Sequence, residues 1–407
     1  MKKIQQIIAA ISDKKHNSAI FKSKFRQKLP DRKSLLLAAS LSFLFSSSSG
    51  CAETSYVPNN QGTTPKTMNV TANNSFFPFG FYHVSWNSTA EQRMNDLRTI
   101  AAAGFNTIHA SLKGSDDVNE YKKFLDEAQR LGVGVITEFG VDRVTAINQL
   151  KDKPAVLAWN IRDDAGISGS PSCDEILKLH NKVKAADPNH STYISVAPGN
   201  QYKNFNYCSD IIGAQDYPIP SERTQVPLHE PIFVMGTATR EAAKFNRKVY
   251  ANLQSFAWEG YRSPSFKEVR NMTYQSLIKG VKGIIYYTYH DDTWDMSTHT
   301  ALWKGMKTLP PEIKQLSPML LNGNLTEIST GIGDIYAGVW TYQNQAAIVV
   351  VNSSYDSTQN LSLTLPLKNV TNASPMFANR PSGMVVKNGK LTGSIKPLEV
   401  HVYNLKL

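Results

Sequence analysis

The 407-residue chain has few cysteines. Only Cys51, Cys173 and Cys208 are present, and no cysteine or histidine cluster has the spacing of a structural zinc site. The sequence therefore excludes a small fold that depends on zinc ligands, and it gives no reason to expect a metal or another cofactor.

Most of the chain has no excess of either basic or acidic side chains. The formal net charge is +11, but residues 1–50 hold 10 of the 44 Lys and Arg and 2 of the 33 Asp and Glu. The remaining 357 residues therefore carry 34 basic and 31 acidic side chains. Such a balanced surface does not predict a groove for phosphates, so nucleic acid is not an expected partner.

Long hydrophobic runs are also missing. The apolar stretch Leu35–Phe45 has about 11 residues, which is too short for a stable membrane span. It follows a basic region and leads through small residues to Cys51, as in a signal peptide. The end of this segment resembles a bacterial lipoprotein processing box, although Ser48 stands where Leu is usual. Residues 1–51 are therefore predicted to be a leader with lipidation at Cys51. The protein is expected to be exported and anchored to a bacterial membrane, in the periplasm or at the cell surface, with plain secretion as the alternative.

Strand-like and helix-like segments alternate along the middle of the chain. Residues 52–75, rich in Asn, Thr, Pro and Ser, are predicted to be a flexible tether. Eight strand–helix units then occupy residues 76–320, which predicts an α/β fold with a closed (β/α)8 TIM barrel. Gly104, Gly132 and Gly280 lie where helices should end. A doubly wound open sheet is the alternative, but no Gly-X-Gly-X-X-Gly follows the first strand.

The pattern changes after Asn322. Short strand-like runs separated by Gly, Asn, Ser and Pro predict a small antiparallel β-sandwich over residues 321–407. In the predicted barrel, Cys173 follows the fourth strand and Cys208 precedes the sixth. Because these positions fall at opposite ends of the barrel, we expect the two cysteines not to pair, although an exported protein permits a disulfide.

Carboxylates follow several of the predicted strands. In a parallel barrel the strand C-termini carry the working groups, and a pair of carboxylates there can cleave a glycosidic bond. The candidates at these positions are Glu138, Asp163, Asp164, Asp216, Glu259, Asp291 and Asp292. Of these, Asp164, Asp216 and Glu138 are the predicted catalytic residues.

Aromatic and polar side chains near the same strand ends are predicted to bind a carbohydrate. The predicted substrate-binding set is Trp86, Asp163, Tyr217, Gln254, Trp258, Tyr287, Tyr289, Asp291 and Trp294. Side chains alternate along a strand, so Tyr287 and Tyr289 are expected to share one face. Trp258 and Trp294 lie in loops beyond strand ends, where an indole ring can serve as a platform for a sugar.

The order and spacing of four segments resemble barrel glycoside hydrolases of the clan that includes cellulase-like and β-galactosidase-like enzymes. The segments are 76–82, 158–164, 210–218 and 272–287. The resemblance implies a general acid at the end of strand 4, where Asp164 replaces the usual Glu. It also implies a Glu nucleophile at the end of strand 7, where this chain has Gln254. An amide cannot be the nucleophilic carboxylate, so the usual two-step mechanism is not expected here.

Three readings of the site follow. Asp164 pairs with Asp216 or Glu138, or Glu259 supplies the second carboxylate, or the site binds sugar without cleaving it. The leading function is hydrolysis of an oligo- or polysaccharide at the cell envelope by a monomer. The alternatives are a non-catalytic carbohydrate-binding lipoprotein and a lipoprotein whose barrel is only a structural or adhesive body.

Overall fold

The computed structural model describes residues 76–85, 87–113, 118–140, 142–197, 199–219 and 228–407. The predicted leader, tether and lipidation site Cys51 lie outside the described residues, as does Trp86. Within these ranges, no helix is both long enough and apolar enough to cross a bilayer.

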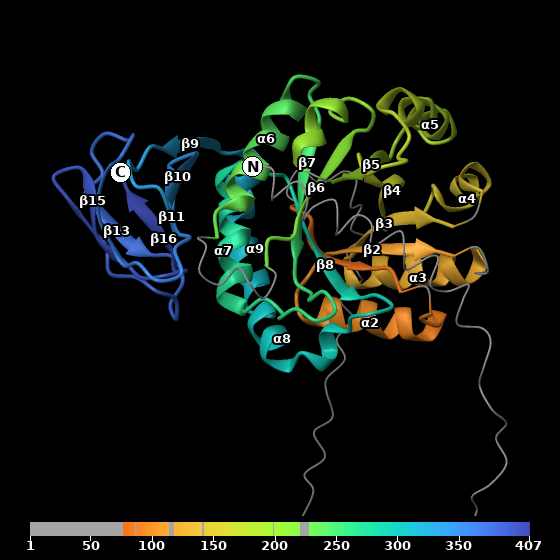
Figure 1. Cartoon of the computed structure of the whole chain (residues 1–407), viewed down its shortest axis with the longest axis horizontal. Coiled ribbons are helices and arrows are strands. Elements are labelled where there is room, and N and C mark those ends of the chain that lie inside the picture. The colour runs from red at the N-terminus through yellow and green to blue at the C-terminus, as the bar shows by residue number, and fades with distance from the viewer. Residues whose placement is uncertain (1–75, 86, 114–117, 141, 198, 220–227) are drawn as a thin grey trace, which may run out of the picture. The chain divides into compact units, whose positions relative to one another are not determined.

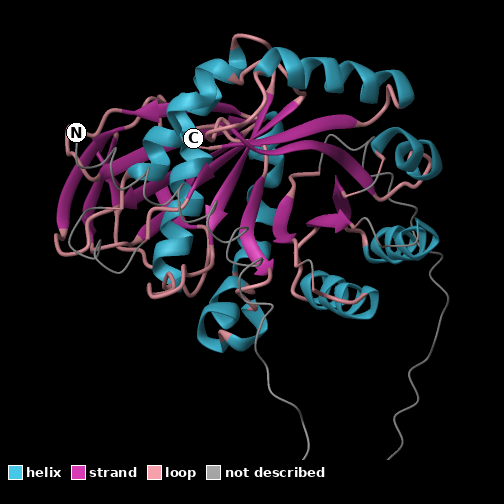
Figure 2. Cartoon of the chain, turned by 45° about the vertical axis from the view of Figure 1, so that its right-hand side comes forward, coloured by secondary structure: helices cyan, strands magenta, loops and turns pink. Residues whose placement is uncertain are grey.

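Eight parallel strands close into a barrel, as predicted, and helices alternate with them around its outside (Figures 1 and 2). The strands are β1 (Phe79–His83), β2 (Thr107–Leu112), β3 (Gly134–Phe139), β4 (Val156–Ala165), β5 (Ser191–Val196), β6 (Ile211–Asp216), β7 (Lys248–Gln254) and β8 (Ile284–His290). The helices are α2 (Ala90–Ala102), α3 (Val118–Leu131), α4 (Arg143–Leu150), α5 (Cys173–Ala186), α6 (Glu230–Ala243), α7 (Phe266–Ile278), α8 (Thr300–Met306) and α9 (Leu309–Asn322). The fifth unit has the 3₁₀ helix η1 (Gly199–Asn204) in place of an α-helix.

Local sequence signals set the ends of these helices. Ser172 and Ser265 each begin a capping box, in which the serine and a glutamate three residues later satisfy backbone N–H groups of the first turn. The predicted glycines after α2, α3 and α7 have φ values of 92°, 72° and 75°, a conformation that costs glycine little.

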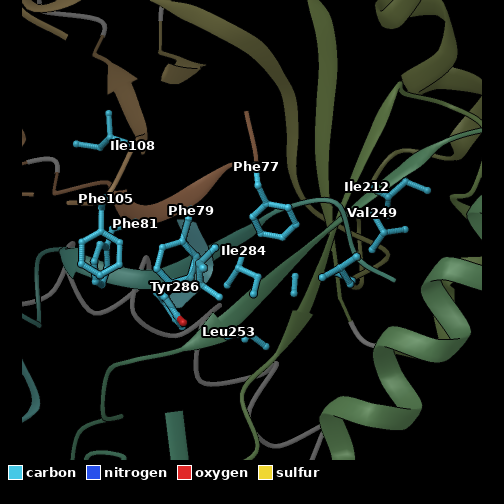
Figure 3. Packing of buried hydrophobic residues seen from close by; sticks show 14 of the residues in the cluster. Phe77, Phe79, Phe81, Phe105, Ile108, Ile212, Val249, Leu253, Ile284 and Tyr286 are labelled. Carbon is cyan, nitrogen blue, oxygen red and sulfur yellow. The ribbon is translucent and has the colours of Figure 1, made fainter. Parts of the chain in front are cut away.

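Strand pleating divides the barrel core into two layers. Phe79 and Phe81 of β1 point outward and pack with Phe105 and with residues of β8, as Figure 3 shows. Tyr82 points inward instead. The interior cluster contains Tyr82, Ile136, Ala158, Tyr193, Ile211, Tyr250 and Ile285.

The C-terminal strands form two antiparallel sheets, which confirms the predicted β domain. One sheet has the order β13-β16-β11-β10-β9 and the other has the order β12-β15-β14. Their bounds are β9 (Asn324–Ile328), β10 (Ile335–Tyr342), β11 (Gln345–Asn352), β12 (Gln359–Thr364), β13 (Asn372–Pro375), β14 (Val385–Lys387), β15 (Lys390–Ile395) and β16 (Val400–Lys406). Alternate residues of the two sheets, among them Ile348, Leu363 and Leu391, form a separate buried cluster.

Helix α7 lies between the barrel and the larger of these sheets. Every residue from Glu268 to Ile278 is buried, including the polar ones. Arg270 Nη1 donates to the carbonyl of Val400 at 2.9 Å, and Asn271 Nδ2 donates to the carbonyl of Asn352 at 2.8 Å. These hydrogen bonds offset the free-energy cost of burying the polar side chains of Arg270 and Asn271.

The expectation for the cysteines was wrong, because Cys173 and Cys208 form a disulfide with a Cα–Cα distance of 5.4 Å. The reason lies in the irregular fifth unit. No α-helix follows β5, and the segment that returns from η1 to β6 passes the first turn of α5. Next to Cys208, the Tyr207 hydroxyl donates to Asp174 Oδ1 at 2.7 Å, which brings the two cysteines together.

Removing this disulfide is predicted to destabilise the protein without changing its fold. The bridge spans 35 residues, and loss of such a constraint on the unfolded chain costs about 2–4 kcal/mol. The double variant Cys173→Ser/Cys208→Ser should therefore have a lower midpoint in urea and an unchanged far-UV circular dichroism spectrum. An unchanged midpoint would show that the bridge contributes nothing to stability.

Candidate functional site

Glu138 points into the C-terminal end of the barrel. On β3, Ile136 belongs to the interior cluster and Val135 to the outer core, so Glu138 shares the inward face with Ile136. The Ser111 hydroxyl donates to Glu138 Oε2 at 3.4 Å, and His109 Nδ1 lies 4.0 Å from the same oxygen. The Glu138 side chain remains 20% exposed, so solvent or a ligand can reach it.

The surroundings of Glu138 favour its protonated form. Loss of hydration is the main cause, and the negative charges of Asp163 and, more weakly, Asp164 add to it, while the hydrogen bond from Ser111 and the charge of Arg143 act in the opposite direction. Together these effects raise the pKa of Glu138 to about 8. At neutral pH this side chain therefore holds a proton that it can donate.

An irregularity in β4 brings two consecutive acids to the same place. Asn160 pairs with Tyr193 and Ala165 with Val196, so β4 advances five residues where β5 advances three. The Ser195 hydroxyl donates to Asp163, while the backbone N–H of Asp164 donates to Ser195 Oγ at 2.8 Å. Asp164 has a φ of 52°, a left-handed conformation that aspartate adopts more readily than most residues.

Gln215 completes this cluster from β6. Its Nε2 donates to Asp164 Oδ1 at 2.6 Å and to Ser195 Oγ at 2.9 Å. Ser195 and Gln215 thus hold the two carboxylates in place, and neither was among the predicted site residues. Strand alternation could have found Gln215, because Ile211 of the same strand faces the interior four residues earlier.

Asp216, a predicted catalytic residue, lies on the other face of β6. Ile212 and Ala214 on that face belong to the outer core, and Asp216 is only 8% exposed. Its charge contributes, after burial, to raising the pKa of Tyr202 in η1. The structure therefore does not bring Asp216 to Glu138 and Asp164, because the inward position belongs to Gln215.

Three predicted aromatic residues form a wall beside the acids. Tyr217, Trp258 and Tyr287 are each partly exposed. The ring centroids of Tyr217 and Tyr287 are 5.7 Å apart, and those of Tyr217 and Trp258 are 6.5 Å apart. Burial first, and then neighbouring charges that include Asp163 and Asp164, raise the pKa of both tyrosines, so both side chains lie near the acids.

Gln254 is not open to a ligand. Its side chain is fully buried, its Oε1 accepts from the N–H of Ile219 at 2.8 Å, and its Nε2 donates to the carbonyls of Ile219 and Phe256. The Gln254 amide therefore fixes the segment after β6 and is not available to bind a sugar. Glu259, the other acid near this strand, is exposed in a turn.

Tyr289 and Trp294 are buried rather than presented to a ligand. Tyr289 packs on Phe81 and Trp303 in the outer core, so it does not share a face with Tyr287 as expected. Strand pairing is irregular at this point, where Phe81 pairs with Tyr286 but His83 pairs with His290. Trp294 is 6% exposed and stacks on His299 at 3.6 Å.

Asp291 and Asp292 organise the loop after β8. Asp291 Oδ1 accepts from the backbone N–H groups of Thr293 and Trp294, and its charge also contributes, after burial, to the raised pKa of Tyr287. Asp292 accepts from the Ser85 hydroxyl at 3.2 Å. Asp291 therefore lies beside the aromatic wall, whereas Asp292 connects the loops after β1 and β8.

A layer of paired polar groups forms the floor of the site. The hydroxyls of Tyr82 and Tyr193 lie 2.9 Å apart, and Asn252 Nδ2 donates to both. His109 stacks on Tyr82 at 4.0 Å, and burial lowers the pKa of this histidine to about 3. The ring of His109 is therefore neutral, and its Nε2 lies 3.0 Å from Asn160 Nδ2.

The dependence of Glu138 on its neighbours gives a direct test. Replacing Asp163 by Asn removes a negative charge, so the pKa of Glu138 should fall from about 8 toward the ordinary value for glutamate. Carboxyl ¹³C NMR of the protein would follow this titration. An Asp292→Asn variant is the control, because Asp292 is exposed and bonded to a different loop. An unchanged Glu138 titration in Asp163→Asn would contradict the described arrangement.

Comparison with known proteins adds information about the fold. No protein-family model matches the sequence, and no curated protein matches it. Among solved structures, an α-amylase from Geobacillus thermoleovorans in complex with acarbose has a TM-score of 0.59 and 12% identity, covering 82% of this chain and 99% of that chain. A family 30 subfamily 8 xylanase from Clostridium acetobutylicum has a TM-score of 0.52 and 12% identity, covering 81% and 96%. A family 39 glycoside hydrolase from Bacteroides cellulosilyticus has a TM-score of 0.52 and 10% identity, covering 84% and 83%. The chain therefore shares the barrel fold of glycoside hydrolases.

Proposed function

We propose that the protein hydrolyses glycosidic bonds in an oligo- or polysaccharide. The observation that carries this proposal is the position of Glu138 beside Asp163 and Asp164 at the C-terminal end of the barrel, where burial and the charges of these two acids raise its pKa. Glycosidases need two carboxyl groups in different protonation states, and an environment that separates their pKa values supplies them. The shared fold supports the same class of reaction.

In this mechanism Glu138 is the general acid. It protonates the oxygen of the leaving sugar as the glycosidic bond breaks, which avoids the release of an alkoxide. Asp164, oriented by Gln215, supplies the second carboxylate, which either activates water or attacks the sugar ring. Asp163 acts through Glu138, because its charge is the largest electrostatic contribution to the raised pKa of that acid.

This assignment moves the acid from strand 4 to strand 3. The family resemblance gave Asp164 the role of the acid, but burial and neighbouring charges give Glu138 the proton at neutral pH. It also accounts for Gln254 in place of the strand-7 glutamate. A second carboxylate from strand 4 makes a nucleophile on strand 7 unnecessary.

The aromatic wall supports binding of sugar rings. Tyr217, Trp258 and Tyr287 offer partly exposed ring faces next to the acids. The apolar faces of pyranose rings pack on such surfaces while their hydroxyls bond to polar groups. We place the reaction at the cell envelope because of the predicted leader and Cys51.

Replacing Glu138 by Gln should remove hydrolysis and keep substrate binding. The amide preserves the shape of the side chain but has no acidic proton, so kcat should fall by about 10²- to 10⁴-fold. Activity should be measured on a panel of aryl glycosides and polysaccharides, and binding should be measured by calorimetry on any substrate found. Aryl glycosides with a good leaving group should be less affected, because they need less protonation.

The matched control is Glu259→Gln, which makes the same chemical change at an exposed acid in the turn beyond β7. It should leave kcat unchanged. If Glu259→Gln and not Glu138→Gln abolishes turnover, the proposed acid is wrong.

The pH dependence of the reaction should show the pKa of Glu138. The acid is active when protonated, so kcat/KM should be maintained below this pKa and fall as pH rises through about 8. A rate that instead rises through pH 8 would show that the ionised form is the active one.

The second candidate is a carbohydrate-binding protein on a glycosidase fold. The observation in its favour is the burial of Gln254, which leaves the strand-7 position without a carboxylate. Both candidates use the aromatic wall, so Trp258→Ala should weaken sugar binding by about 3- to 10-fold. Phe233→Ala, an exposed aromatic position on α6, is the control. Weaker sugar binding by Trp258→Ala, together with no turnover by the unmodified protein on any substrate, would favour this second candidate.

A further inference from the structure

Two histidines and an aspartate meet where the barrel closes. His83 is the last residue of β1, His290 is the last residue of β8, and Asp96 lies in α2. Asp96 Oδ2 is 2.7 Å from His83 Nε2 and 3.2 Å from His290 Nδ1. One donor atom from each of the three side chains lies within 4.8 Å of the others.

The triad is separate from the acids inside the barrel. Tyr82 faces the interior, so the adjacent His83 faces outward, toward α2. His83 and Asp96 are buried, whereas the His290 side chain is 19% exposed. The triad therefore has one side that solvent can reach.

We infer that His83, Asp96 and His290 bind one divalent transition-metal ion of the Zn²⁺ class. Two imidazole nitrogens and one carboxylate oxygen favour such an ion over Ca²⁺ or Mg²⁺, which prefer oxygen ligands. Three protein ligands leave a fourth position for water on the side of His290.

The two distances from Asp96 Oδ2 are close to the spacing between ligand atoms of a bound metal ion. Ligand atoms about 2.0–2.1 Å from a tetrahedral ion lie about 3.3 Å from one another. Binding thus requires a small widening of the His83–Asp96 distance and an adjustment of the His290 ring. Gln92 Nε2 lies 3.3 Å from both oxygens of Asp96 and donates to the carboxylate, as outer partners of metal ligands do.

The position of the site indicates a structural role for the ion. The pairing of β1 with β8 shifts in register between Phe81 and His83, so regular strand bonding is interrupted where these strands end. An ion held by both strands and α2 would strengthen this closure. Because the ion binds only the folded chain, it should raise the unfolding temperature.

The test is Co²⁺ binding to the full chain after treatment with a chelator. We expect equilibrium dialysis to show one Co²⁺ per chain. The bound Co²⁺ should give visible d–d absorption bands, which disappear when Zn²⁺ replaces it. Either ion should raise the unfolding temperature. Asp96→Asn and His290→Gln should each weaken Co²⁺ binding at least 10-fold. His229→Gln, which changes a partly exposed histidine at the start of α6, should bind Co²⁺ as the unmodified protein does.

The unmodified protein alone can overturn the inference. If it binds no Co²⁺ or Zn²⁺ at micromolar concentration, or its unfolding temperature does not change, the three residues are only a hydrogen-bonded cluster. Binding that is equally strong in His290→Gln would place the ion elsewhere and would also overturn the inference. His290 is partly exposed, so this variant is expected to fold even if Asp96→Asn does not.

Discussion

The alternation of side chains along parallel strands decides which residues can take part in chemistry. In a closed barrel every second residue of a strand faces one shared interior, and the others face the helices. Glu138 and Gln215 fall on the inward set, and Asp216 falls on the outward set. Asp163 and Asp164 are consecutive residues of β4, yet both contact Ser195, because extra residues in that strand interrupt the alternation.

A closed interior also requires that its polar groups be paired. Tyr82, Tyr193 and Asn252 bond to one another below the acids, and Ser195 donates to Asp163 while accepting from its neighbours. These partners fix the side chains, and the same burial, together with the charge of Asp163, favours the protonated form of Glu138. The rigidity of the site and the raised pKa of its acid thus have a common physical origin.

The barrel and the β domain could be predicted because their signals are local and repeated. Apolar runs, helix caps and glycines such as Gly132 indicate each element independently of the others. The site was harder to predict, since the interruptions in β4 and β8 have no signature in sequence and move single residues such as Tyr289 to another face. The disulfide and the cluster around Asp96 depend on contacts between distant segments, which periodicity does not report.

Helix α7 shows that the β domain is not an appendage. Its polar residues Arg270 and Asn271 have backbone partners in β16 and β11, and nearly all of its surface is buried. A chain shortened at the end of α9 would expose this helix, with unsatisfied polar groups in an apolar surface. The barrel therefore depends on its C-terminal sheets to satisfy the polar groups of this helix.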